Sequence, residues 1–570
     1  MTAIGIDFGT TNSVVAAHTS GVTEVIPLDS APVEWAPYGF DNVFPTVMAR
    51  DEAGRLEFGW SAKKSNEGRF DAVKRLFATQ LDLAVDEAGE AIAVEEVATM
   101  LFAELRRRAV DRGGLSDVDS AVITVPANSK GRARHRTKLC AGMSGLEVLA
   151  LINEPTAAAM AYAQRHPEAR QLLVFDWGGG TLDVTVLQSY DGVFIEQASA
   201  GLPRSGGLDF DSRLEKIVRE SVPGLETLSS RERHELRLEV ELAKIRLSST
   251  EATTIEIPGG RSHRVTRARF EQEIRPLLDG SREPVERCLS EISSGLGGID
   301  AVVLVGGTCR IPAVRNFVRE LVGVEPDPDV NPMTAVGEGA AISAAILAGA
   351  AAESDLFVAL EHALGTYVID PADMERRFST IIPRGHKLPA VASDDFTPIV
   401  RETEGLNIEV VEGDPDASVP DFTPLKEWYV PLPETYDEQS SRSVNIEYRY
   451  DVDGILQVIV KDIDTSKVLL ADDVSYGVAE DKRKLKEISD RAKSAVETGA
   501  VSGAERAENS DPETLKLITQ ARSKVLPFLD GREAEEVEAA VKSLEEAEGA
   551  ALIDAREALA TALRPYSYLF

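Results

Sequence analysis

Two short segments far apart in the chain share one design, and this repeat constrains the fold more than any other feature of the sequence. The segment GIDFGTTNS (5–13) places Asp7 after an apolar run and before a Gly/Thr turn. The segment VFDWGGGTLDV (174–184) places Asp176 in the same position before a second such turn. Each segment predicts a strand, a tight turn and a second strand. One copy is typical of an ordinary β-hairpin, but two copies with matched aspartates indicate two related halves.

The two turns predict an anion-binding site. Their candidate ligands are Thr10, Thr11 and Asn12 in the first turn and Gly178, Gly179, Gly180 and Thr181 in the second. Glycines leave backbone N–H groups unshielded, so two facing turns can hold a polyphosphate from both sides. Asp7 and Asp176 supply carboxylates of the kind that bind a hydrated Mg²⁺ ion.

Residues 1–352 alternate between strand-like and helix-like segments, which predicts an α/β domain. AVITV (121–125) and AVVLV (301–305) are expected as strands, and EEVATMLFAELRRRAV (95–110) as a helix. A duplicated α/β fold closes a cleft between its halves, where a ligand would bind. Gly306-Gly307 directly follow AVVLV. Such a glycine pair permits close approach of a nucleotide to the backbone, but it is equally typical of a plain strand-to-helix turn.

The chain beyond this first domain has a different pattern and predicts further domains. The apolar run DLFVAL (355–360) lies in a segment, 353–363, that is expected to be a linker or an edge strand. Residues 364–477 are rich in strand patterns, and Asp453-Gly454 between two alternating runs is a hairpin signal. Residues 478–570 are acidic and predict helices with an apolar stripe.

Charge, cysteine usage and the N-terminus narrow the function classes. The chain has 61 basic and 95 acidic residues, a formal charge of -34, which disfavours binding to nucleic acid or to an anionic membrane. Its three cysteines have no pattern of a disulfide framework or a zinc site and fit a reducing compartment. The first residues lack the basic and apolar regions of a secretory signal, so we expect a cytoplasmic protein.

The motifs of several enzyme classes are missing from the sequence. It contains no G-x-x-x-x-G-K-[ST] loop, no H-E-x-x-H and no G-x-S-x-G. A P-loop ATPase, a zinc hydrolase and a serine esterase therefore lose their main support.

An ordered set of motifs resembles one family, the DnaK-type, seventy-kilodalton heat-shock chaperones. The motifs that carry the resemblance are GIDFGTTNS (5–13), DAVKRLF (71–77), INEPTAAAMAY (152–162), VFDWGGGTLDV (174–184), GGLDFD (206–211), LVGGTCRIPAV (304–314) and NPMTAVGEGAAISAAIL (331–347). The resemblance implies an actin-like ATPase domain, a duplicated ribonuclease H-like α/β fold with two lobes around ATP or ADP. It continues more faintly through STIIPRG (379–385), LNIEVVEGD (406–414) and YDVDGILQVIVKD (450–462). These segments imply a peptide-binding β-sandwich followed by a short α-helical lid.

The resemblance also implies roles for individual residues. Asp7 and Asp176 would organise Mg²⁺ through water, and Asp183 would orient the attacking water. Lys74 would reach the γ-phosphate, and Glu154 would orient or deprotonate water. The two turns would bind phosphates, with Thr181 also a catalytic residue. The remaining nucleotide contacts would be Glu241, Lys244, Ser248, Gly306, Gly307 and Arg310.

The resemblance implies coupling between domains, and the sequence also departs from the family. Pro126 and Arg134 match positions that relay the nucleotide state. The family's aromatic pair is replaced by Asn128-Ser129, and its Gly-Gly substrate loop is not visible in LGTYVIDPADMERRF (364–378). The lid is short, and the chain ends in the aromatic segment RPYSYLF (564–570).

Three functions remain open at this point. The first is an ATP-hydrolysing, DnaK-like chaperone that binds client polypeptides and works with a J-domain cochaperone and a nucleotide-exchange factor. The second is a nucleotide-dependent scaffold or assembly factor that binds one folded partner, which the departures in residues 364–477 favour. The third, a sugar kinase of the same actin-like superfamily, would leave residues 364–570 without a role.

Overall fold

The computed structural model describes most of the chain. The described residues are 2–51, 54–66, 68–78, 83–85, 91–115, 117–127, 129, 131–190, 193–202, 205–290, 292, 296–349, 362–384, 386–387, 389–400, 403–413, 415, 422–433, 442–451, 456–474, 482–499, 514, 517–518, 520–526, 529, 531–545, 547 and 551–564. The apolar run of the predicted linker, Asn128, Asp453-Gly454 and the aromatic segment after Arg564 lie outside these residues.

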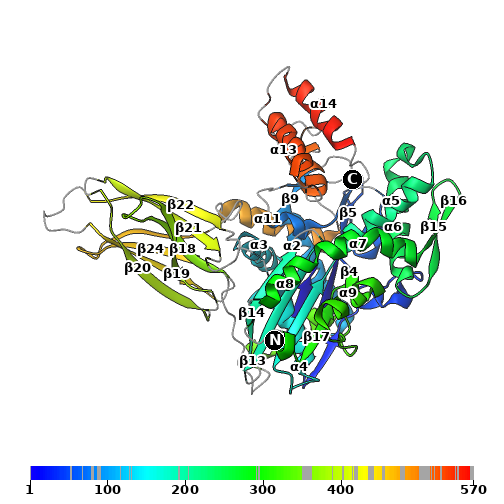
Figure 1. Cartoon of the computed structure of the whole chain (residues 1–570), viewed down its shortest axis with the longest axis horizontal. Coiled ribbons are helices and arrows are strands. Elements are labelled where there is room, and N and C mark those ends of the chain that lie inside the picture. Colours follow the sequence, from blue (N-terminus) through cyan, green and yellow to red (C-terminus); the bar gives the residue numbers. More distant parts are fainter. Residues whose placement is uncertain are drawn as a thin grey trace.

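The first half of the N-terminal region is built on one mixed sheet (Figure 1). Its strands are β1 (Thr2–Phe8), β2 (Asn12–Thr19), β3 (Val22–Val25), β4 (Phe44–Pro45), β10 (Val118–Val125) and β11 (Glu147–Asn153). Strand β1 pairs antiparallel with β2 and parallel with β10, which in turn pairs parallel with β11. Ile4, Ile6 and Phe8 of β1 are fully buried, so alternate residues of this strand anchor the core of the first half.

The second half repeats this arrangement. Its sheet has the order β14-β13-β12-β17, with β12 (Gln171–Trp177), β13 (Leu182–Tyr190), β14 (Val193–Leu202) and β17 (Ala301–Val305). Strand β12 pairs antiparallel with β13 and parallel with β17, as β1 does with β2 and β10. The predicted strands AVITV and AVVLV are confirmed as parts of β10 and β17, and the two related halves share one local topology.

Two helices rich in small residues connect the halves. Helix α4 (Glu154–Ala163) and helix α10 (Ala335–Leu347) contribute buried alanines to a core that also contains Val122 of β10 and Val174 of β12. A Cβ atom at Gly339 of α10 would lie 1.7 Å from the Ala157 carbonyl oxygen, and one at Gly5 would lie 2.0 Å from the Ala341 nitrogen. The backbones approach this closely only because these positions lack side chains. The small residues of Ala335–Leu347 therefore form a buried helix packed closely against its neighbours.

Outer helices and short strands complete each half. Those of the first half are α1 (Trp60–Lys64), α2 (Val94–Gly113), α3 (Gly131–Met143), β5 (Met48–Arg50), β6 (Leu56–Phe58), β7 (Arg69–Phe70), β8 (Leu83–Val85), β9 (Ala91–Ala93), η1 (Ala36–Tyr38), η2 (Phe40–Asn42) and η3 (Val73–Leu76). Those of the second half are α5 (Gly207–Ser221), α6 (Ser230–Leu247), α7 (Arg267–Gly280), α8 (Arg282–Ser290), α9 (Pro312–Val322), β15 (Ala252–Ile257), β16 (Arg261–Thr266), η4 (Leu225–Thr227), η5 (Leu296–Gly298) and η6 (Gly307–Arg310). Helix α6 begins where Ser229 and Glu232 form a capping box.

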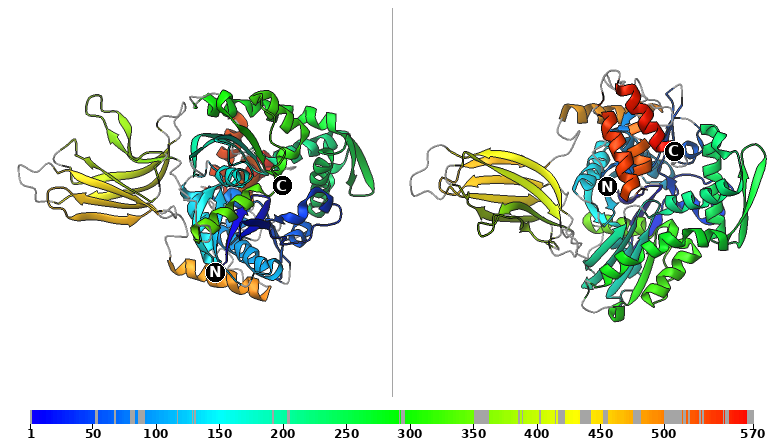
Figure 2. Two further views of the ribbon diagram at one scale, coloured as in Figure 1. Left: turned by 90° about the horizontal axis from the view of Figure 1, so that it is seen from below. Right: turned by 45° about the horizontal axis from the view of Figure 1, so that its top comes forward.

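The C-terminal strands form two antiparallel sheets that share one core. One sheet has the order β19-β18-β21-β22 and the other β20-β23-β24-β25. Their bounds are β18 (Ala363–Ile369), β19 (Arg376–Ile382), β20 (Ala390–Phe396), β21 (Gly405–Gly413), β22 (Thr423–Pro431), β23 (Val444–Tyr450), β24 (Leu456–Asp462) and β25 (Val468–Asp473). Ile408 and Val410 of the first sheet pack with Ile446 and Val458 of the second, as in a sandwich. Figure 2 shows these strands beside the N-terminal sheets.

The C-terminal helices fall into two separate groups. Helix α11 (Lys482–Thr498) lies along α2 and α3, where Ile488 and Ala492 are fully buried in the core of the first half (Figure 2). The Arg491 guanidinium of α11 donates to the Glu96 carboxylate over 2.7 Å. The π-helix η8 (Gln520–Val525), α13 (Gly531–Glu545) and α14 (Ala551–Leu563) form a cluster of their own. Within the described part of the chain, no helix is both long and apolar enough to cross a membrane.

Candidate functional site

The two repeated turns lie at equivalent ends of β1 and β12. Asp7 is the last but one residue of β1, and Asp176 is the last but one residue of β12, where it pairs with Asp183 of β13. The second turn is closed by a hydrogen bond from the Gly178 N–H to the Thr181 carbonyl over 3.1 Å. The Thr181 hydroxyl donates to the Asp183 carboxylate over 3.1 Å.

The two turns face each other across the junction of the halves. A Cβ atom added at Gly179 would lie 2.5 Å from the Thr11 Oγ1, and one added at Gly180 would lie 3.1 Å from the Thr10 Oγ1. The first of these distances is too short for a carbon–oxygen contact, so a Cβ atom there would require the Thr11 side chain or one of the turns to shift. The structure therefore brings the two glycine turns together, in the facing arrangement that the sequence predicted for an anion-binding site.

The third glycine pair packs against the second turn. Gly306 has φ +85°, and a Cβ atom there would lie 2.3 Å from the Trp177 carbonyl oxygen. The Thr308 hydroxyl donates to the Gly178 carbonyl over 2.8 Å. This segment continues into η6 and then α9, so it is a strand-to-helix turn, and it also packs against the second glycine turn.

The sequence-predicted site residues all line one cavity of about 1290 Å³, which lies between the halves and extends to Arg384, Thr423 and Arg522 of the C-terminal region. These residues are Asp7, Thr10, Thr11, Asn12, Lys74, Glu154, Asp176, Gly178, Gly179, Gly180, Thr181, Asp183, Glu241, Lys244, Ser248, Gly306, Gly307 and Arg310. A volume of this size holds a nucleotide with its polyphosphate and bound water.

Buried charges concentrate at the floor of the cleft. The Lys74 ammonium lies 2.6 Å from the Glu154 carboxylate, and both side chains are only 10% exposed. Burial and the nearby Glu154 charge raise the pKa of Asp7 to about 7, although Lys74 and a hydrogen bond from Thr124 oppose the shift. Burial and the charges of Glu154 and Asp183 hold the pKa of Asp176 well above its usual range.

This charge distribution fits a divalent cation. Burial disfavours the charged form of Lys74, but the carboxylates of Glu154 and Asp7 outweigh that effect and raise its pKa. One ammonium thus faces several carboxylates that repel one another. Mg²⁺ takes oxygen ligands and keeps water in its shell, so a hydrated ion beside Asp7 and Asp176 would stabilise their ionised forms.

The opposite wall of the cleft comes from α6 and the loops around it. Glu241 of α6 forms a 2.7 Å ion pair with Lys63, which connects the two halves above the cleft. Lys244 donates to the Asp211 carboxylate and to the Gly207 carbonyl, each over 2.9 Å. Arg310 donates to the carbonyl of Tyr38. These polar groups are held in place by contacts within the protein itself.

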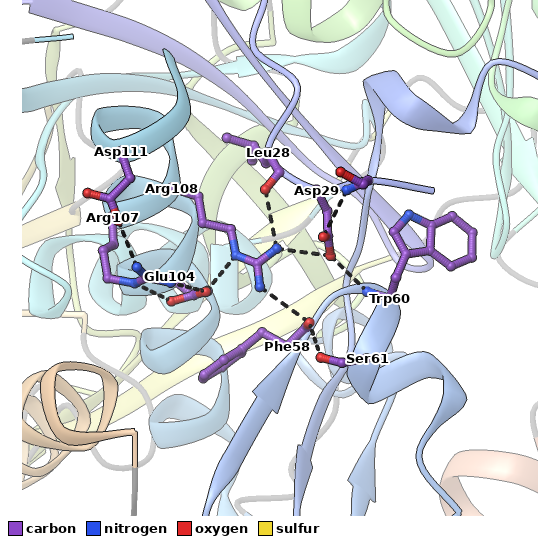
Figure 3. A network of polar contacts seen from close by, with 10 residues as sticks. Leu28, Asp29, Phe58, Trp60, Ser61, Glu104, Arg107, Arg108 and Asp111 are labelled. Carbon is purple, nitrogen blue, oxygen red and sulfur yellow. Dashed lines mark hydrogen bonds and ion pairs between the residues drawn. The ribbon is translucent and has the colours of Figure 1, made fainter. Parts of the chain in front are cut away.

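Helix α1, which carries Lys63, is anchored by a polar network (Figure 3). Arg108 of α2 lies 2.9 Å from the Asp29 carboxylate and donates to Glu104 over 2.6 Å. Asp29 in turn accepts a hydrogen bond from the Trp60 N–H over 3.0 Å at the first residue of α1. The position of the Lys63–Glu241 ion pair is therefore fixed from α2.

Comparison with known proteins decides the family of this chain. A family profile described as "Hsp70 protein" matches residues 64–568. The chain belongs to the Hsp70 family. It is 33% identical over 524 residues to the "Chaperone protein DnaK" of Thermosipho africanus, covering 87% of this chain and 85% of the relative. It is 33% identical over 488 residues to the protein of the same name from Thermotoga neapolitana, covering 81% and 79%. With the Thermus thermophilus protein it shares 32% over 508 residues, covering 82% and 79%.

Membership of the Hsp70 family implies an actin-like ATPase domain, a β-sandwich and a helical lid. The described mixed sheets, the paired antiparallel sheets and the C-terminal helices provide elements for each of these parts.

The β-rich part of this Hsp70 chain contacts the N-terminal region, which contains both halves of the cleft, through polar side chains. The predicted relay residue Arg134 donates to the Asn153 side chain over 3.1 Å, and Asn153 donates to Glu196 over 3.2 Å. Glu196 also lies 3.7 Å from Arg384, which follows β19. Asn153 immediately precedes Glu154, so the contacts reach the floor of the cleft. The other relay residue, Pro126, lines the cleft.

Several residues of the site had no role in the sequence analysis. Arg75 donates to the Gly180 carbonyl over 3.4 Å, and a Cβ atom at Gly206 would lie 2.5 Å from the Gly179 carbonyl carbon. Both lie within motifs that carried the family resemblance, DAVKRLF and GGLDFD, so their neighbours were the available signal. Arg384 and Glu412 of the β-rich part lie within the fainter motifs STIIPRG (379–385) and LNIEVVEGD (406–414), which carried the resemblance but assigned no role to either residue.

Proposed function

We propose that this Hsp70-type chaperone, an ATPase, binds ATP and Mg²⁺ in the cleft between its two N-terminal halves and uses hydrolysis to regulate the binding of client polypeptides. The observation that carries the proposal is the gathering of both glycine turns, Lys74 and the carboxylates in one cleft. The match with DnaK chaperones extends over most of the chain, β-rich part included, so we prefer a chaperone to a scaffold or a sugar kinase.

We assign the parts of the chain as follows. Residues 1–352 form the actin-like ATPase domain, a duplicated ribonuclease H-like fold, and 353–363 form the linker. Residues 364–477 form the β-sandwich that binds the client, and 478–570 form the helical lid. The antiparallel sheets with a shared core support the third assignment. The shared topology around β1 and β12 supports the first.

In the proposed mechanism the chain's own groups orient the phosphates and the attacking water. Backbone N–H groups and hydroxyls of the two turns bind the phosphates from both halves. The Lys74 ammonium stabilises charge that develops on the γ-phosphate. Asp183 orients the attacking water, and Glu154 orients it or accepts its proton. Asp7 and Asp176 would hold Mg²⁺ through water, and the bound ion would supply charge neutralisation for the phosphates.

On the opposite wall, Glu241, Lys244, Ser248 and Arg310 bind the adenosine part. Gly306 and Gly307 allow the nucleotide to approach the backbone. The ion pair between Lys63 and Glu241 connects the two halves beside this part of the cleft.

Partners and location follow from the same family. We infer that the partners are client polypeptides, a J-domain cochaperone and a nucleotide-exchange factor, and that the protein works in the cytoplasm. The polar contacts through Arg134, Asn153 and Glu196 support coupling between the nucleotide site and the β-sandwich.

The test is ATP turnover by a Lys74→Ala variant of the full chain. We expect hydrolysis to fall by about a hundred-fold or more, the effect of removing one group that stabilises transition-state charge. Lys216→Ala, which removes a half-exposed lysine of α5 outside the cleft, is the matched control and should hydrolyse ATP at the wild-type rate. Wild-type turnover by Lys74→Ala would refute the assignment of the cleft.

A further inference from the structure

The segment that carries Lys74 has a strained backbone. Ala72, directly before η3, has φ 51° and ψ 27°, the left-handed region that residues with a Cβ atom rarely adopt. The Arg75 N–H donates to the Ala72 carbonyl over 2.9 Å, and the Phe77 N–H donates to the Lys74 carbonyl over 3.1 Å. A strained conformation of this kind persists only where the surroundings hold it.

A fully buried guanidinium holds this segment from behind. Arg136 of α3 donates from Nη1 to the Leu76 carbonyl, the last residue of η3, over 3.0 Å. Its side chain is 0% exposed, and its Nε lies 3.0 Å from the Glu95 carboxylate of α2, which is 1% exposed. Arg136 thus ties η3 to two helices of the first half.

Stability alone does not explain why Arg136 and Glu95 are buried together at this place. Removing two charges from water is costly, and a buried pair is often no more stabilising than apolar side chains of similar volume. Neither of these two described side chains lines the cleft, so neither touches the nucleotide directly. What the pair provides is a rigid, directed hydrogen bond to the one carbonyl that ends the Lys74 segment.

Lys74 itself depends on this support. Its ammonium must lie between Glu154, 2.6 Å away, and the phosphates in the cleft. The core behind the segment is aromatic, since Phe77 stacks on Phe8 with ring centroids 6.1 Å apart. Aromatic packing restricts the segment in one direction but does not fix a carbonyl, whereas the Arg136 hydrogen bond does.

We propose that Arg136, held by Glu95, is a positioning residue for ATP hydrolysis: it fixes the Leu76 carbonyl and so places the Lys74 ammonium against the γ-phosphate. This inference rests on the proposed function of Lys74. It predicts that loss of the pair slows the chemical step while nucleotide binding, which uses many other groups, is retained.

The test is a double variant, Arg136→Met with Glu95→Met, that removes both charges and leaves no unpaired ion. Replacement by apolar side chains of similar volume preserves the fold. We expect an unchanged or higher melting temperature, a dissociation constant for ATP within about three-fold of wild type, and single-turnover hydrolysis slower by about ten- to hundred-fold. The same exchange of the Arg219–Glu215 pair of α5, Arg219→Met with Glu215→Met, should leave hydrolysis unchanged.

Two further variants keep the outcome decisive. In a Lys74→Ala background the double substitution should cause no further loss, because Arg136 acts only through Lys74. Arg136→Lys keeps the charge opposite Glu95 but lacks the planar fork that reaches both partners, so it should fold and should also hydrolyse slowly at an unchanged ATP affinity.

The inference and the proposed function fail in different ways. If Lys74→Ala retains full turnover, the proposed function is wrong. If Lys74→Ala loses turnover but the Met double variant or Arg136→Lys hydrolyses ATP at the wild-type rate, only the role of Arg136 is overturned. Additive losses in the Lys74→Ala background would overturn it as well.

Discussion

At the scale of single residues, the cleft owes its shape to positions that lack a side chain as well as to its charged groups. Gly179 and Thr11 come from different halves, yet a Cβ atom on the glycine would lie within 2.5 Å of the Thr11 Oγ1. A turn that is locally acceptable for many residues is therefore restricted by its partner turn. The restriction follows from the closed arrangement of the two halves.

Replacing Gly179 with alanine should weaken nucleotide binding. The new methyl group would displace Thr11 or separate the two turns, and a misplacement of about 1 Å in a binding group has large effects, so we expect the dissociation constant for ATP to rise by about ten-fold or more. Isothermal titration calorimetry measures it. Gly280→Ala is the control, since nothing lies within 4 Å of a Cβ atom there. Equal affinities of both variants would show that the turns separate freely.

The carboxylates at the floor of the cleft predict a pH dependence of stability. The pKa of Asp7 is raised to about 7 in the folded chain from an ordinary value of 3.8. Between these values the folded chain holds a proton that the unfolded chain has released, so the free energy of unfolding falls as pH rises, by up to about 1.4 kcal/mol per unit. The stabilisation that protonated Asp7 gives the folded chain is complete below about pH 4 and is lost as the pH rises through about 7.

This dependence is measured without nucleotide by urea unfolding at several pH values. Asp7→Asn should give a flatter curve between pH 4 and 7 than the wild type. Asp111→Asn, which changes a half-exposed side chain of α2, should follow the wild-type curve. Parallel curves for wild type and Asp7→Asn would mean that Asp7 titrates normally.

At the scale of elements, the helix α11 belongs structurally to the first half. Its buried residues Ile488, Ala492 and Ala495 follow a spacing of four and three, so they form one stripe of the helix facing α2. Ser489 adds a hydrogen bond to the Met143 carbonyl at the end of α3 over 2.9 Å. The region predicted as one helical lid thus contains a helix docked on the N-terminal halves and a separate cluster of α13 and α14.

Truncating the centre of this stripe should loosen the first half. Ile488→Ala removes a fully buried side chain, which typically costs about 2–5 kcal/mol. Hydrogen exchange should then show faster exchange of α2 and α11 amides and unchanged protection of the β18–β25 sheets. The control is Glu487→Ala, a half-exposed neighbour on the same helix, which should change stability by less than about 0.5 kcal/mol. Unchanged α2 protection in Ile488→Ala would show that α11 docks only transiently.

The elements also show where sequence reasoning reaches its limit. The turns after β1 and β12 were predictable because an apolar strand, an aspartate and glycines lie within a few residues of one another. The ion pair between Lys63 and Glu241 joins residues 178 positions apart, and nothing local marks either residue as its partner. Arg136 likewise reads as a surface arginine of a basic helix, and only the packing of α2 and η3 around it shows that it is buried.

In the molecule as a whole, a buried hydrogen bond joins the first N-terminal half to the β-sandwich. The Gly131 N–H at the start of α3 donates to the Glu412 carboxylate of β21 over 2.8 Å, between residues 281 positions apart. Glu412 is 3% exposed, so its charge depends on this contact and its neighbours. This contact contributes to a nucleotide response only if it is stronger in one nucleotide state than in the other.

Removing the Glu412 carboxylate should therefore weaken the coupling between nucleotide and client. A buried N–H left without its partner costs about 1–3 kcal/mol, which shifts the equilibrium between joined and separated domains by about five- to 150-fold. In Glu412→Ala we expect the ratio of peptide dissociation constants with ATP and with ADP to shrink by about five-fold or more. ATP affinity should stay at the wild-type value, because Glu412 does not line the described cleft.

Fluorescence anisotropy of a labelled aliphatic peptide, measured with each nucleotide, gives this ratio. Glu409→Ala is the matched control, because Glu409 lies on the same strand but pairs with Arg376, another residue of the β-sandwich, and not with the N-terminal region. It should keep the wild-type ratio. If Glu412→Ala also kept that ratio, the contact would hold the domains together equally in both nucleotide states, and coupling would have to pass through Arg134, Asn153 and Glu196 instead.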